Sequence, residues 1–357
     1  MMMEIKEKRK SAMQRKKDLE KEERAKASAV KQTQTAIKFI KDHFERELSK
    51  ALNLSRVSAP RFLQQGTGLQ DDLAGSQIPV QFKAKALATL IEMVHSLAKW
   101  KRYALKKYNF TIGSGLYTDM DAVRKDETLD ALHSIYVDQW DWEKAISKKE
   151  RNLAYLKKTV EKIYDAIGIT QKKLKKELGL ALPPLPKTIT FIHSLDAQKA
   201  YPDKSPKERE DLLTKKYGAV FLIGIGSPLA DGKPHDTRAF DYDDWTTMVK
   251  GKPGLNGDIL VWHEPLKTTL ELSSMGIRVD KKALLLQAKL TGNMESLKLP
   301  FHKAVLEHTV PLSIGGGIGQ SRLCMYLLQK RHIGEVQCSV WPDRMVEECK
   351  SQGIILL

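Results

Sequence analysis

The sequence predicts an α+β domain in which helices flank an antiparallel sheet, and two observations support this prediction. Strand and helix patterns alternate irregularly along the chain, and residues 258–272 contain two short apolar or β-branched runs typical of an antiparallel hairpin. A doubly wound parallel sheet would instead require strands and helices in regular alternation. The boundaries given below follow from apolar periodicity and from capping residues.

The composition limits the class of protein. The 357 residues are 41% hydrophobic and 29% charged, which is typical of a globular chain. The longest apolar run, Ala219–Ile225, is far shorter than the roughly 18 residues of a membrane-spanning helix. The first residues, MMMEIKEKRK, lack the apolar segment of a secretory signal, so we expect a cytoplasmic protein without membrane contact. The net charge of +16 favours anionic partners, either nucleic acid or anionic small substrates.

The chain is expected to begin with a basic, charged extension, residues 1–34, ahead of a folded domain, residues 35–357. Residues 1–31 hold 11 Lys or Arg and 6 Asp or Glu, an excess of 11 − 6 = +5, and have few large apolar side chains. We predict a solvated helical extension, and a basic helix that contacts RNA is the alternative. From Thr35 onwards, apolar residues recur every three or four positions and predict an amphipathic helix that starts the domain.

The middle of the chain mixes helical and strand patterns. An apolar helical pattern covers roughly residues 86–106, and Ser134–Trp142 alternates like a strand. Helical patterns return over about 148–178. The proline-rich segment Leu180–Lys187 is expected to be a connection, because proline removes backbone donors. A strand, Ile189–His193, follows it.

The second half continues with a capped helix and the hairpin. Ser205 as N-cap and Pro206 at the first helical position predict a helix that Gly218 ends before the strand Ala219–Ile223. In the hairpin, Asp258–Trp262 and Lys267–Leu272 surround a loop at His263–Leu266. That register would place Asp258 directly opposite Glu271, with Cβ atoms roughly 5 Å apart. A final helix should start in the glycine run near residue 319.

The glycine run IGGGIGQSRL, Ile314–Leu323, is the sharpest chemical signal. Glycine lets a ligand approach the backbone closely, and the amides at a helix N-terminus favour anions. Arg322 would lie in the first helical turn, where it could grip a phosphate. The run lacks the Lys-Ser/Thr ending of a P-loop and does not open the first βα unit, so Walker and Rossmann sites fit poorly.

A second signal is Arg124 followed by the strand pattern in LHSIYVDQWDWEK. The period of two places Gln139 and Asp141 on one face of that strand, and Trp140 and Trp142 on the other. Gln139 and Asp141 can therefore share a pocket.

These segments resemble known motifs. The glycine run is similar to the third signature motif of class II aminoacyl-tRNA synthetases, and Arg124 with its strand is similar to the second. Together with further segments in the same order, the chain resembles the ammonia-dependent asparagine synthetase family from about residue 35 to 345. Those segments are GTGLQDDLAG, VHSLAKWKR, GLYTDM, VDQWDWE, DYDDW, GLNGDILVW and ELSSMGIRVD. The resemblance implies a homodimeric class II catalytic domain that adenylates the β-carboxylate of L-aspartate with ATP and lets ammonia displace AMP.

The resemblance also implies roles for individual residues. Arg124 would hold the α-phosphate of ATP and Arg322 the γ-phosphate, and both would act in catalysis with Gln139 and Asp71. The other residues implied to bind ATP are Arg238, Asp243, Gly317 and Gly319. The residues implied to bind aspartate are Ser96, Lys101, Gln139, Asp141, Ser274 and Arg278, with Asp141 and Ser96 at the ammonium end. Either Lys101 or Arg278 would hold the α-carboxylate, although the run of Lys99, Lys101 and Arg102 is otherwise typical of a solvated helix face.

Two acidic sites complete the set. Two carboxylates with phosphate oxygens are the usual ligands of Mg²⁺, so Asp258 and Glu271 are the expected magnesium ligands, Glu271 the surer of the two. Asp71 matches the family position that attracts ammonium, and the neighbouring Asp72 leaves the identity of the acceptor open.

The sequence leaves three alternatives to this function. A glutamine-dependent enzyme would need an amidotransferase cysteine at its amino terminus, but Cys324, Cys338 and Cys349 all follow residue 320. These three cysteines lack CxxC spacing, so they indicate neither a disulfide framework nor a zinc site. An aspartyl- or asparaginyl-tRNA synthetase would ordinarily place an anticodon-binding domain before the catalytic core, whereas about 35 residues precede it here. A tRNA-binding paralogue is suggested by the basic extension. The redox role of Cys324 stays open.

Overall fold

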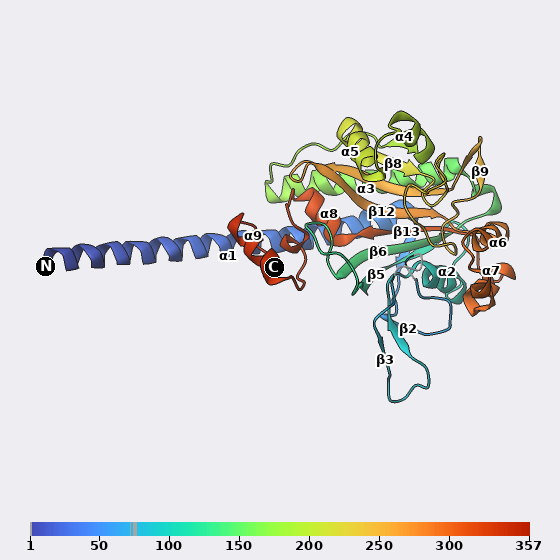
Figure 1. Ribbon diagram of the computed structural model, residues 1–357, viewed down its shortest axis with the longest axis horizontal. Coiled ribbons are helices and arrows are strands. Elements are labelled where there is room, and N and C mark those ends of the chain that lie inside the picture. Colours follow the sequence, from blue (N-terminus) through green and yellow to red (C-terminus); the bar gives the residue numbers. More distant parts are fainter. Residues whose placement is uncertain (1, 72, 74–76) are drawn as a thin grey trace.

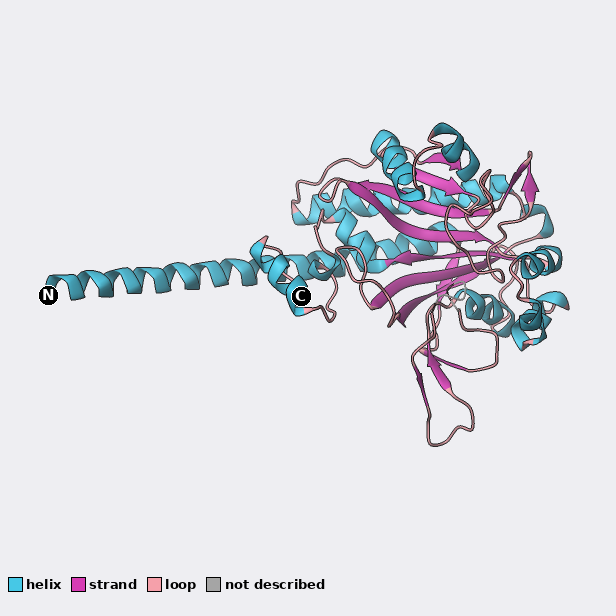
Figure 2. Cartoon of the chain, viewed as in Figure 1, coloured by secondary structure: helices cyan, strands magenta, loops and turns pink. Residues whose placement is uncertain are grey.

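The computed structural model describes residues 2–71, 73 and 77–357, and its centre is an eight-stranded sheet (Figures 1 and 2). Across the sheet the strands are β1 (Leu54–Arg56), β5 (Gly115–Val123), β6 (Tyr136–Ala145), β13 (Ser313–Gly319), β12 (Thr268–Ile277), β11 (Asn256–His263), β8 (Ala219–Ile223) and β7 (Thr190–His193). Neighbouring strands are antiparallel except at the two edges, where β1 pairs with β5 and β7 pairs with β8 in parallel. The predicted α+β class is therefore confirmed, with a mixed rather than purely antiparallel sheet.

Helices cover the sheet on both sides. They are α1 (Met2–Leu52), α2 (Ala98–Lys107), α3 (Leu153–Leu178), α4 (Ser194–Ala200), α5 (Pro206–Tyr217), α6 (Lys281–Leu290), α7 (Pro300–Leu306), α8 (Gln320–Leu327) and α9 (Asp343–Ser351), with the 3₁₀ turns η1 (Lys148–Glu150), η2 (Met294–Lys298) and η3 (Ile333–Glu335). The second half of α1 packs with α3 and α8 in the main hydrophobic core, where Phe44 lies against Trp140. The helix α2 packs against β5, β6 and β13. No helix in the described part of the chain has the length and apolar character that crossing a bilayer requires.

Two small sheets lie outside this core. One has the order β2 (Phe62–Gln64), β4 (Ile91–Met93), β3 (Gln81–Phe82) and stands away from the body of the domain, and the other pairs β9 (Met248–Val249) with β10 (Lys252–Pro253) (Figure 1). The predicted helix at 86–106 was therefore wrong in its first half. Ile91–Met93 forms backbone pairs with β2 and β3 instead, and the helix begins only after Ser96, whose Oγ accepts a hydrogen bond from the Ala98 amide.

The helix α1 runs without a break from the charged extension into the domain, so the expected start at Thr35 is not a helix boundary. What changes there is burial. The described side chains from Met13 to Ala29 are exposed, whereas Ile40, Phe44 and Leu48 are buried. The first half of the helix projects away from the domain (Figure 1). A helix that is polar on all sides has no face to pack, which is why the extension stays clear of the core.

Several sequence predictions about caps are confirmed. Ser205 accepts a hydrogen bond from the Glu208 amide and Glu208 returns one to the Ser205 amide, which is a capping box, and Pro206 opens α5. Gly218 follows the last helical residue at φ +75°, a backbone conformation that a residue with a side chain rarely adopts. Leu180–Lys187 is a connection, as predicted, and the last predicted helix, α8, begins directly after Gly319.

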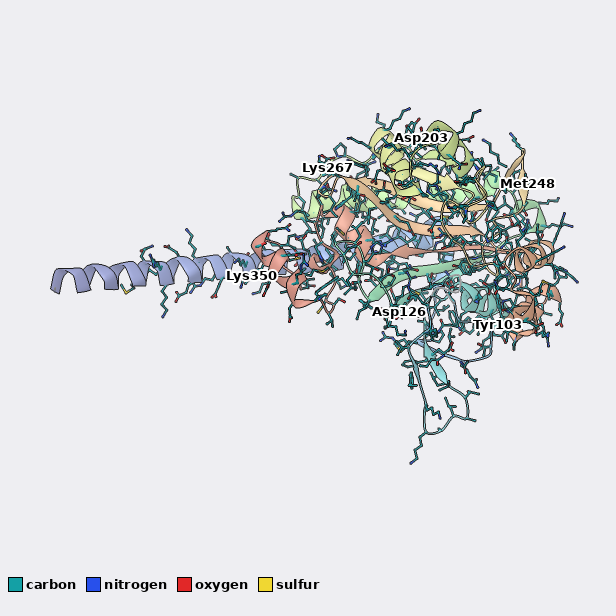
Figure 3. The ribbon with its side chains drawn as sticks, viewed as in Figure 1. Tyr103, Asp126, Asp203, Met248, Lys267 and Lys350 are labelled. Atoms are coloured by element: carbon teal, nitrogen blue, oxygen red, sulfur yellow. The ribbon has the colours of Figure 1, made fainter. Side chains whose placement is uncertain are left out.

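The predicted register of the β11–β12 hairpin was wrong. His263 pairs with Thr268, so the turn covers residues 264–267, one position later than predicted, and Lys267 takes φ +53°. An irregularity between Ile259 and Leu260 shifts the register again. As a result Glu271 lies opposite Leu260, not opposite Asp258. Lys267 marks this turn at the edge of the domain (Figure 3).

Candidate active site

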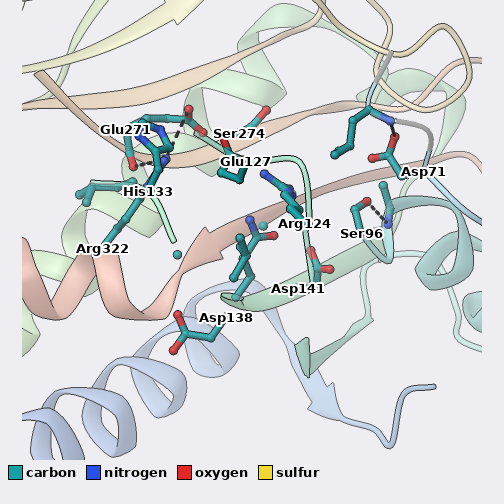
Figure 4. Close-up of a pocket in the computed structure, with 18 of the residues that line it drawn as sticks. Asp71, Ser96, Arg124, Glu127, His133, Asp138, Asp141, Glu271, Ser274 and Arg322 are labelled. Atoms are coloured by element: carbon teal, nitrogen blue, oxygen red, sulfur yellow. Dashed lines mark hydrogen bonds and ion pairs between the residues drawn. The ribbon is translucent and has the colours of Figure 1, made fainter. Parts of the chain in front are cut away.

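A cavity of about 450 Å³ lies over the middle of the sheet, between β6, β12, β13, the start of α2 and the loops that follow β5 and β8. Figure 4 shows side chains from these elements converging on it. It is lined by every site residue that the sequence suggested except Asp258, namely Asp71, Ser96, Lys101, Arg124, Gln139, Asp141, Arg238, Asp243, Glu271, Ser274, Arg278, Gly317, Gly319 and Arg322. Asp71 and Arg322, which are 251 positions apart in the chain, thus line the same cavity.

The glycine run forms the floor of the cavity. The sequence predicted only that a helix starts near its end, and the structure shows that Ser313–Gly319 is strand β13, which pairs with β6 on one side and β12 on the other. Gly315 lies opposite Glu143, and a Cβ on Gly315 would collide with the Glu143 carboxylate. A Cβ on Gly317 would likewise meet Asp141 and the side-chain amide of Gln139. The glycines therefore make room for the polar side chains of β6.

Lys101 and Asp141 form a buried ion pair on this floor. The Lys101 Nζ donates to Asp141 Oδ1 at 2.6 Å and to the Gly316 carbonyl at 2.8 Å, and Lys101 is only 1% exposed. Burial lowers the pKa of Lys101, although the Asp141 carboxylate opposes this. The second oxygen of Asp141, Oδ2, is buried and has no hydrogen-bond partner among the described residues. A buried unpaired acceptor is costly, so this oxygen is suited to a donor from a ligand.

The alternative of a solvated helix face for Lys99, Lys101 and Arg102 is wrong. All three are buried, because distant segments supply their acceptors. Lys99 donates to Asp241 at 2.7 Å, and Arg102 donates to the carbonyl groups of two loop residues. Burial lowers the pKa of Arg102 to about 10.

Arg278 is held between two carboxylates beside the floor. It donates to Glu143 from Nε and Nη2, at 3.1 and 2.8 Å, and to Asp243 from Nη1 at 2.5 Å. Burial alone would lower the pKa of Arg278, but the two carboxylates raise it well above its ordinary value. Burial raises the pKa of Asp243, and the arginine opposes that shift. Arg278 is therefore a fixed cation whose charge is already balanced.

Two further arginines that line the cavity, Arg124 and Arg322, are less constrained. Arg322 lies in the first turn of α8, as predicted, 3.6 Å from the Glu271 carboxylate and with a hydrogen bond of 3.3 Å to the Glu271 carbonyl. Arg124 directly follows β5, and its Nε is buried without a partner among the described residues. Figure 4 shows Arg124 between the Arg322–Glu271 pair and the Asp71–Ser96 side. Two arginines around one cavity, one with an unused donor, suit a ligand with several anionic groups.

Arg238 and Asp258 form a buried ion pair next to Glu271. Arg238 Nη2 binds both carboxylate oxygens of Asp258, which does not line the cavity. Burial raises the pKa of Asp258 to about 7, and the negative charge of Glu271 adds to this shift, whereas Arg238 opposes it. The two expected magnesium ligands are thus close enough to interact although they are not cross-strand partners. Their metal role stays a prediction; within the described residues, no group of three or more His, Cys, Asp or Glu side chains could hold a metal ion.

Asp71 lies at the wall of the cavity opposite Glu271 (Figure 4). It is 2% exposed, and its Oδ1 accepts a hydrogen bond from the Leu73 amide at 2.9 Å. Ser96 lines the same wall and accepts from the Ala98 amide at the start of α2. Asp72, the residue that left the identity of the acceptor open, lies outside the described residues.

Comparison with known proteins gives the family. A family model described as aspartate-ammonia ligase matches residues 31–353. The chain belongs to the aspartate-ammonia ligase family. Among the similar curated proteins, the aspartate–ammonia ligases of Bacteroides fragilis and Clostridium perfringens are each 52% identical over 330 residues, which cover 92% of this chain and 96% of each relative.

Solved structures of class II aminoacyl-tRNA synthetases share the fold of this aspartate-ammonia ligase family member. The asparaginyl-tRNA synthetase of Pyrococcus horikoshii complexed with asparaginyl-adenylate aligns with a TM-score of 0.65 at 16% identity, covering 87% of this chain and 70% of the synthetase. The asparaginyl-tRNA synthetase of Entamoeba histolytica in complex with asparaginyl-adenylate aligns with a TM-score of 0.62 at 14% identity, covering 87% and 66%. The predicted class II synthetase-like fold is confirmed.

In this ligase family member, sequence reasoning missed two charged side chains at the site. Glu143 continues the alternation of Gln139 and Asp141 along β6, so the period of two could have found it. Asp138 lies on the other face, where its Oδ1 accepts a hydrogen bond from the Ser321 amide at 3.0 Å and its Oδ2 accepts one from Lys41 at 3.0 Å. It thus caps α8, whose own N-cap residue, Gly319, has no side chain. No local signal predicts that cap.

Proposed function

We propose that the chain is an ammonia-dependent asparagine synthetase. It would join the β-carboxylate of L-aspartate to the α-phosphorus of ATP, release diphosphate, and then let ammonia attack the acyl carbon so that AMP leaves. The observation that carries the proposal is that one cavity brings Arg124 and Arg322 together with Lys101, Asp141 and Arg278. The relatives at 52% identity, which are named aspartate–ammonia ligases, support the same reaction.

The arginine end suits the triphosphate. Adenylation brings a carboxylate against a polyanion, so the site must balance the charge of both reactants and hold them in line. Arg124 would hold the α-phosphate, where its partnerless Nε is an available donor. Arg322, now tied loosely to Glu271, would turn to the γ-phosphate. Arg238 and Asp243, with the backbone at Gly317 and Gly319, would border the nucleotide.

The opposite end suits aspartate. The free Oδ2 of Asp141 would accept a hydrogen bond from the substrate ammonium group, with Ser96 beside it. Lys101 has three N–H donors and uses two, so one remains for a substrate carboxylate. Arg278 supplies a second fixed cation. Gln139 and Ser274 border Gly317 and would orient the β-carboxylate.

A magnesium ion fits this donor set in part. Glu271 faces the cavity and has a carboxylate near the expected phosphates, whereas the Asp258 carboxylate is bound to Arg238. Mg²⁺ is usually held by one or two carboxylates together with phosphate oxygens, so we propose Glu271 as the main protein ligand and Asp258 as the second. When bound, the ion would neutralise phosphate charge. Arg238 would hold the Asp258 carboxylate in place.

The second half-reaction needs neutral ammonia, but ammonium predominates at neutral pH. A carboxylate that attracts ammonium and then accepts a proton is therefore useful. We propose Asp71 for this role, because it is a buried carboxylate at the cavity wall. A cytoplasmic homodimer, with residues 1–34 as an appendage to the catalytic domain, is part of the same proposal and rests on the family resemblance.

The test is AMP and asparagine formation from Mg-ATP and L-aspartate, with ammonium, glutamine or tRNA as the third component. We expect turnover with ammonium alone and a loss of at least about 100-fold in Arg322→Ala, the range seen when one charge-stabilising donor is removed. Aminoacylation of tRNA without asparagine formation would instead favour a synthetase. Equal turnover with glutamine would refute the dependence on ammonia.

A further inference from the structure

The wall that carries Asp71 is held by a hydrogen-bond network that the proposed reaction does not use directly. Its members are Gln70 and His95, which lie on the loop after β2 and on the segment between β4 and α2. His95 is fully buried and is not among the residues that line the cavity. Burial of a polar ring is costly without a hydrogen-bond partner, so a buried histidine beside an active-site carboxylate is expected to have a specific role.

Gln70 joins the two segments through its side chain. Its Oε1 accepts hydrogen bonds from the Asp71 amide at 3.2 Å and from the His95 amide at 3.0 Å. Its Nε2 donates to the Met93 carbonyl at 2.7 Å. One side chain therefore ties the backbone on the N-terminal side of Asp71 to the segment that follows β4.

The His95 ring adds a fourth hydrogen bond to this network, and it is the second that involves the Asp71 backbone. Its Nδ1 lies 3.1 Å from the Asp71 carbonyl, and because a carbonyl only accepts, Nδ1 must carry the hydrogen. The Nε2 is then an acceptor, and it is buried without a partner among the described residues. Burial lowers the pKa of His95, and the nearby Arg124 lowers it further, although the Asp71 carbonyl opposes this. The ring is therefore neutral at neutral pH.

The location of the network suggests what it positions. The segment that His95 begins continues into Ser96 and α2, so Asp71 is fixed to the element that presents Ser96 and Lys101. On the other side, the Val94 carbonyl accepts a hydrogen bond from the Val123 amide, next to Arg124. The backbone of Asp71 is thus held at a set place at the cavity wall.

We propose that His95 and Gln70 are positioning residues for the ammonium subsite at Asp71, acting through the hydrogen bonds to the Asp71 backbone. This inference rests on the proposed function. The network bonds directly to the Asp71 backbone, whereas Gln139, Arg278 and Arg322 lie on β6, after β12 and on α8. The second half-reaction should therefore depend on this network far more than adenylation does.

The experiment compares three variants of the full chain in both half-reactions. His95→Leu removes the ring donor, and His95→Asn keeps an amide N–H near the place of Nδ1. His263→Leu is the matched control, because His263 is also fully buried and bonded through its ring to a carbonyl, that of Lys330, but lies outside the cavity lining. Aspartate-dependent exchange of diphosphate into ATP reports adenylation alone, and asparagine formation against ammonium concentration reports the complete reaction.

We expect His95→Leu to raise the KM for ammonium about tenfold, the effect of losing one buried hydrogen-bond partner. Diphosphate exchange should stay within twofold of the wild type, His95→Asn should restore the KM for ammonium, and His263→Leu should leave it unchanged. Gln70→Leu, which removes the hydrogen bonds of the Gln70 side chain, should raise the KM for ammonium in the same way. It replaces His95→Leu as the test if that variant does not fold.

Several results would overturn the inference. An unchanged KM for ammonium in His95→Leu and Gln70→Leu would do so, as would a parallel loss of diphosphate exchange, which would indicate a general structural role. Equal impairment of His95→Asn and His95→Leu would mean that the hydrogen bond from the ring to the Asp71 carbonyl is not what the histidine contributes. A wild type without aspartate-dependent exchange would refute the proposed function itself, and the inference with it.

Discussion

Gly317→Ala tests whether the glycine run exists to admit the side chains of β6. A Cβ at this position would meet the Gln139 amide and lie 3.0 Å from Asp141 Oδ1. Carbon and oxygen atoms at rest keep roughly 3.5 Å apart, so the amide must withdraw by about 1 Å or more. Gly317 has no positive φ, so the substitution adds volume without backbone strain.

The size of the effect follows from what can move. The Gln139 amide is the end of a flexible side chain, so relief is cheap for folding, and we expect a loss of stability of only about 1 kcal/mol. Catalysis should suffer more, because a displacement of about 1 Å in a reacting geometry can cost on the order of 100-fold, or about 2.7 kcal/mol. The assay is kcat/KM for aspartate in diphosphate exchange, with unfolding by denaturant measured on the same samples.

A matched control is Gly168→Ala in α3, where a Cβ would have no neighbour within 4 Å. It adds the same methyl group far from the site and should leave kcat/KM unchanged. If Gly317→Ala kept kcat/KM within threefold of the wild type while folding normally, the assignment of Gln139 and Gly317 to the aspartate end would be wrong.

Three further predictions concern the rest of the chain. Gly168→Ala should raise the free energy of unfolding by about 1 kcal/mol, because alanine is the better helix former, and no gain in a denaturant titration would contradict this. Cys324 should resist alkylation by iodoacetamide at pH 8 in the native state, because burial raises the pKa of its thiol to about 12. The exposed Cys338 should be alkylated, and peptide mass spectrometry distinguishes the two cysteines. Rapid labelling of Cys324 would refute this prediction. Removal of residues 2–30 should leave turnover with ammonium within twofold, because the buried face of α1 begins near Ala36. A tenfold loss would mean that the extension takes part in catalysis. RNA binding that depends on salt and is lost with these residues would support the alternative of an RNA-contacting helix.

Predictions from the sequence were correct where residues close together in the chain determine the structure. The N-cap at Ser205 and the strand alternation that brings Gln139 and Asp141 together are local, and both are confirmed. The helix after the glycine run was also found in place. Motif resemblance then added what periodicity could not, because it joined segments from Asp71 to Arg322 into one cavity.

The misses share a physical reason, which is that distant partners override local pattern. Lys99, Lys101 and Arg102 have the spacing of a solvated face, yet carboxylates and carbonyls from remote segments bury them. The register of the β11–β12 hairpin depended on an irregularity between Ile259 and Leu260, and no glycine or proline at these two positions predicts it. The cap that Asp138 provides to α8 joins residues 183 positions apart.

The central claim is that aspartate is activated as an acyl-adenylate in this cavity. The most direct measurement uses L-aspartate labelled with ¹⁸O in its β-carboxylate, with Mg-ATP and ammonium, followed by mass spectrometry of the nucleotide product. If the carboxylate attacks the α-phosphorus, the bridging oxygen leaves with the nucleotide, so AMP should carry the label and Arg322→Ala should form little of it. Unlabelled AMP, or release of ADP and phosphate, would contradict the account.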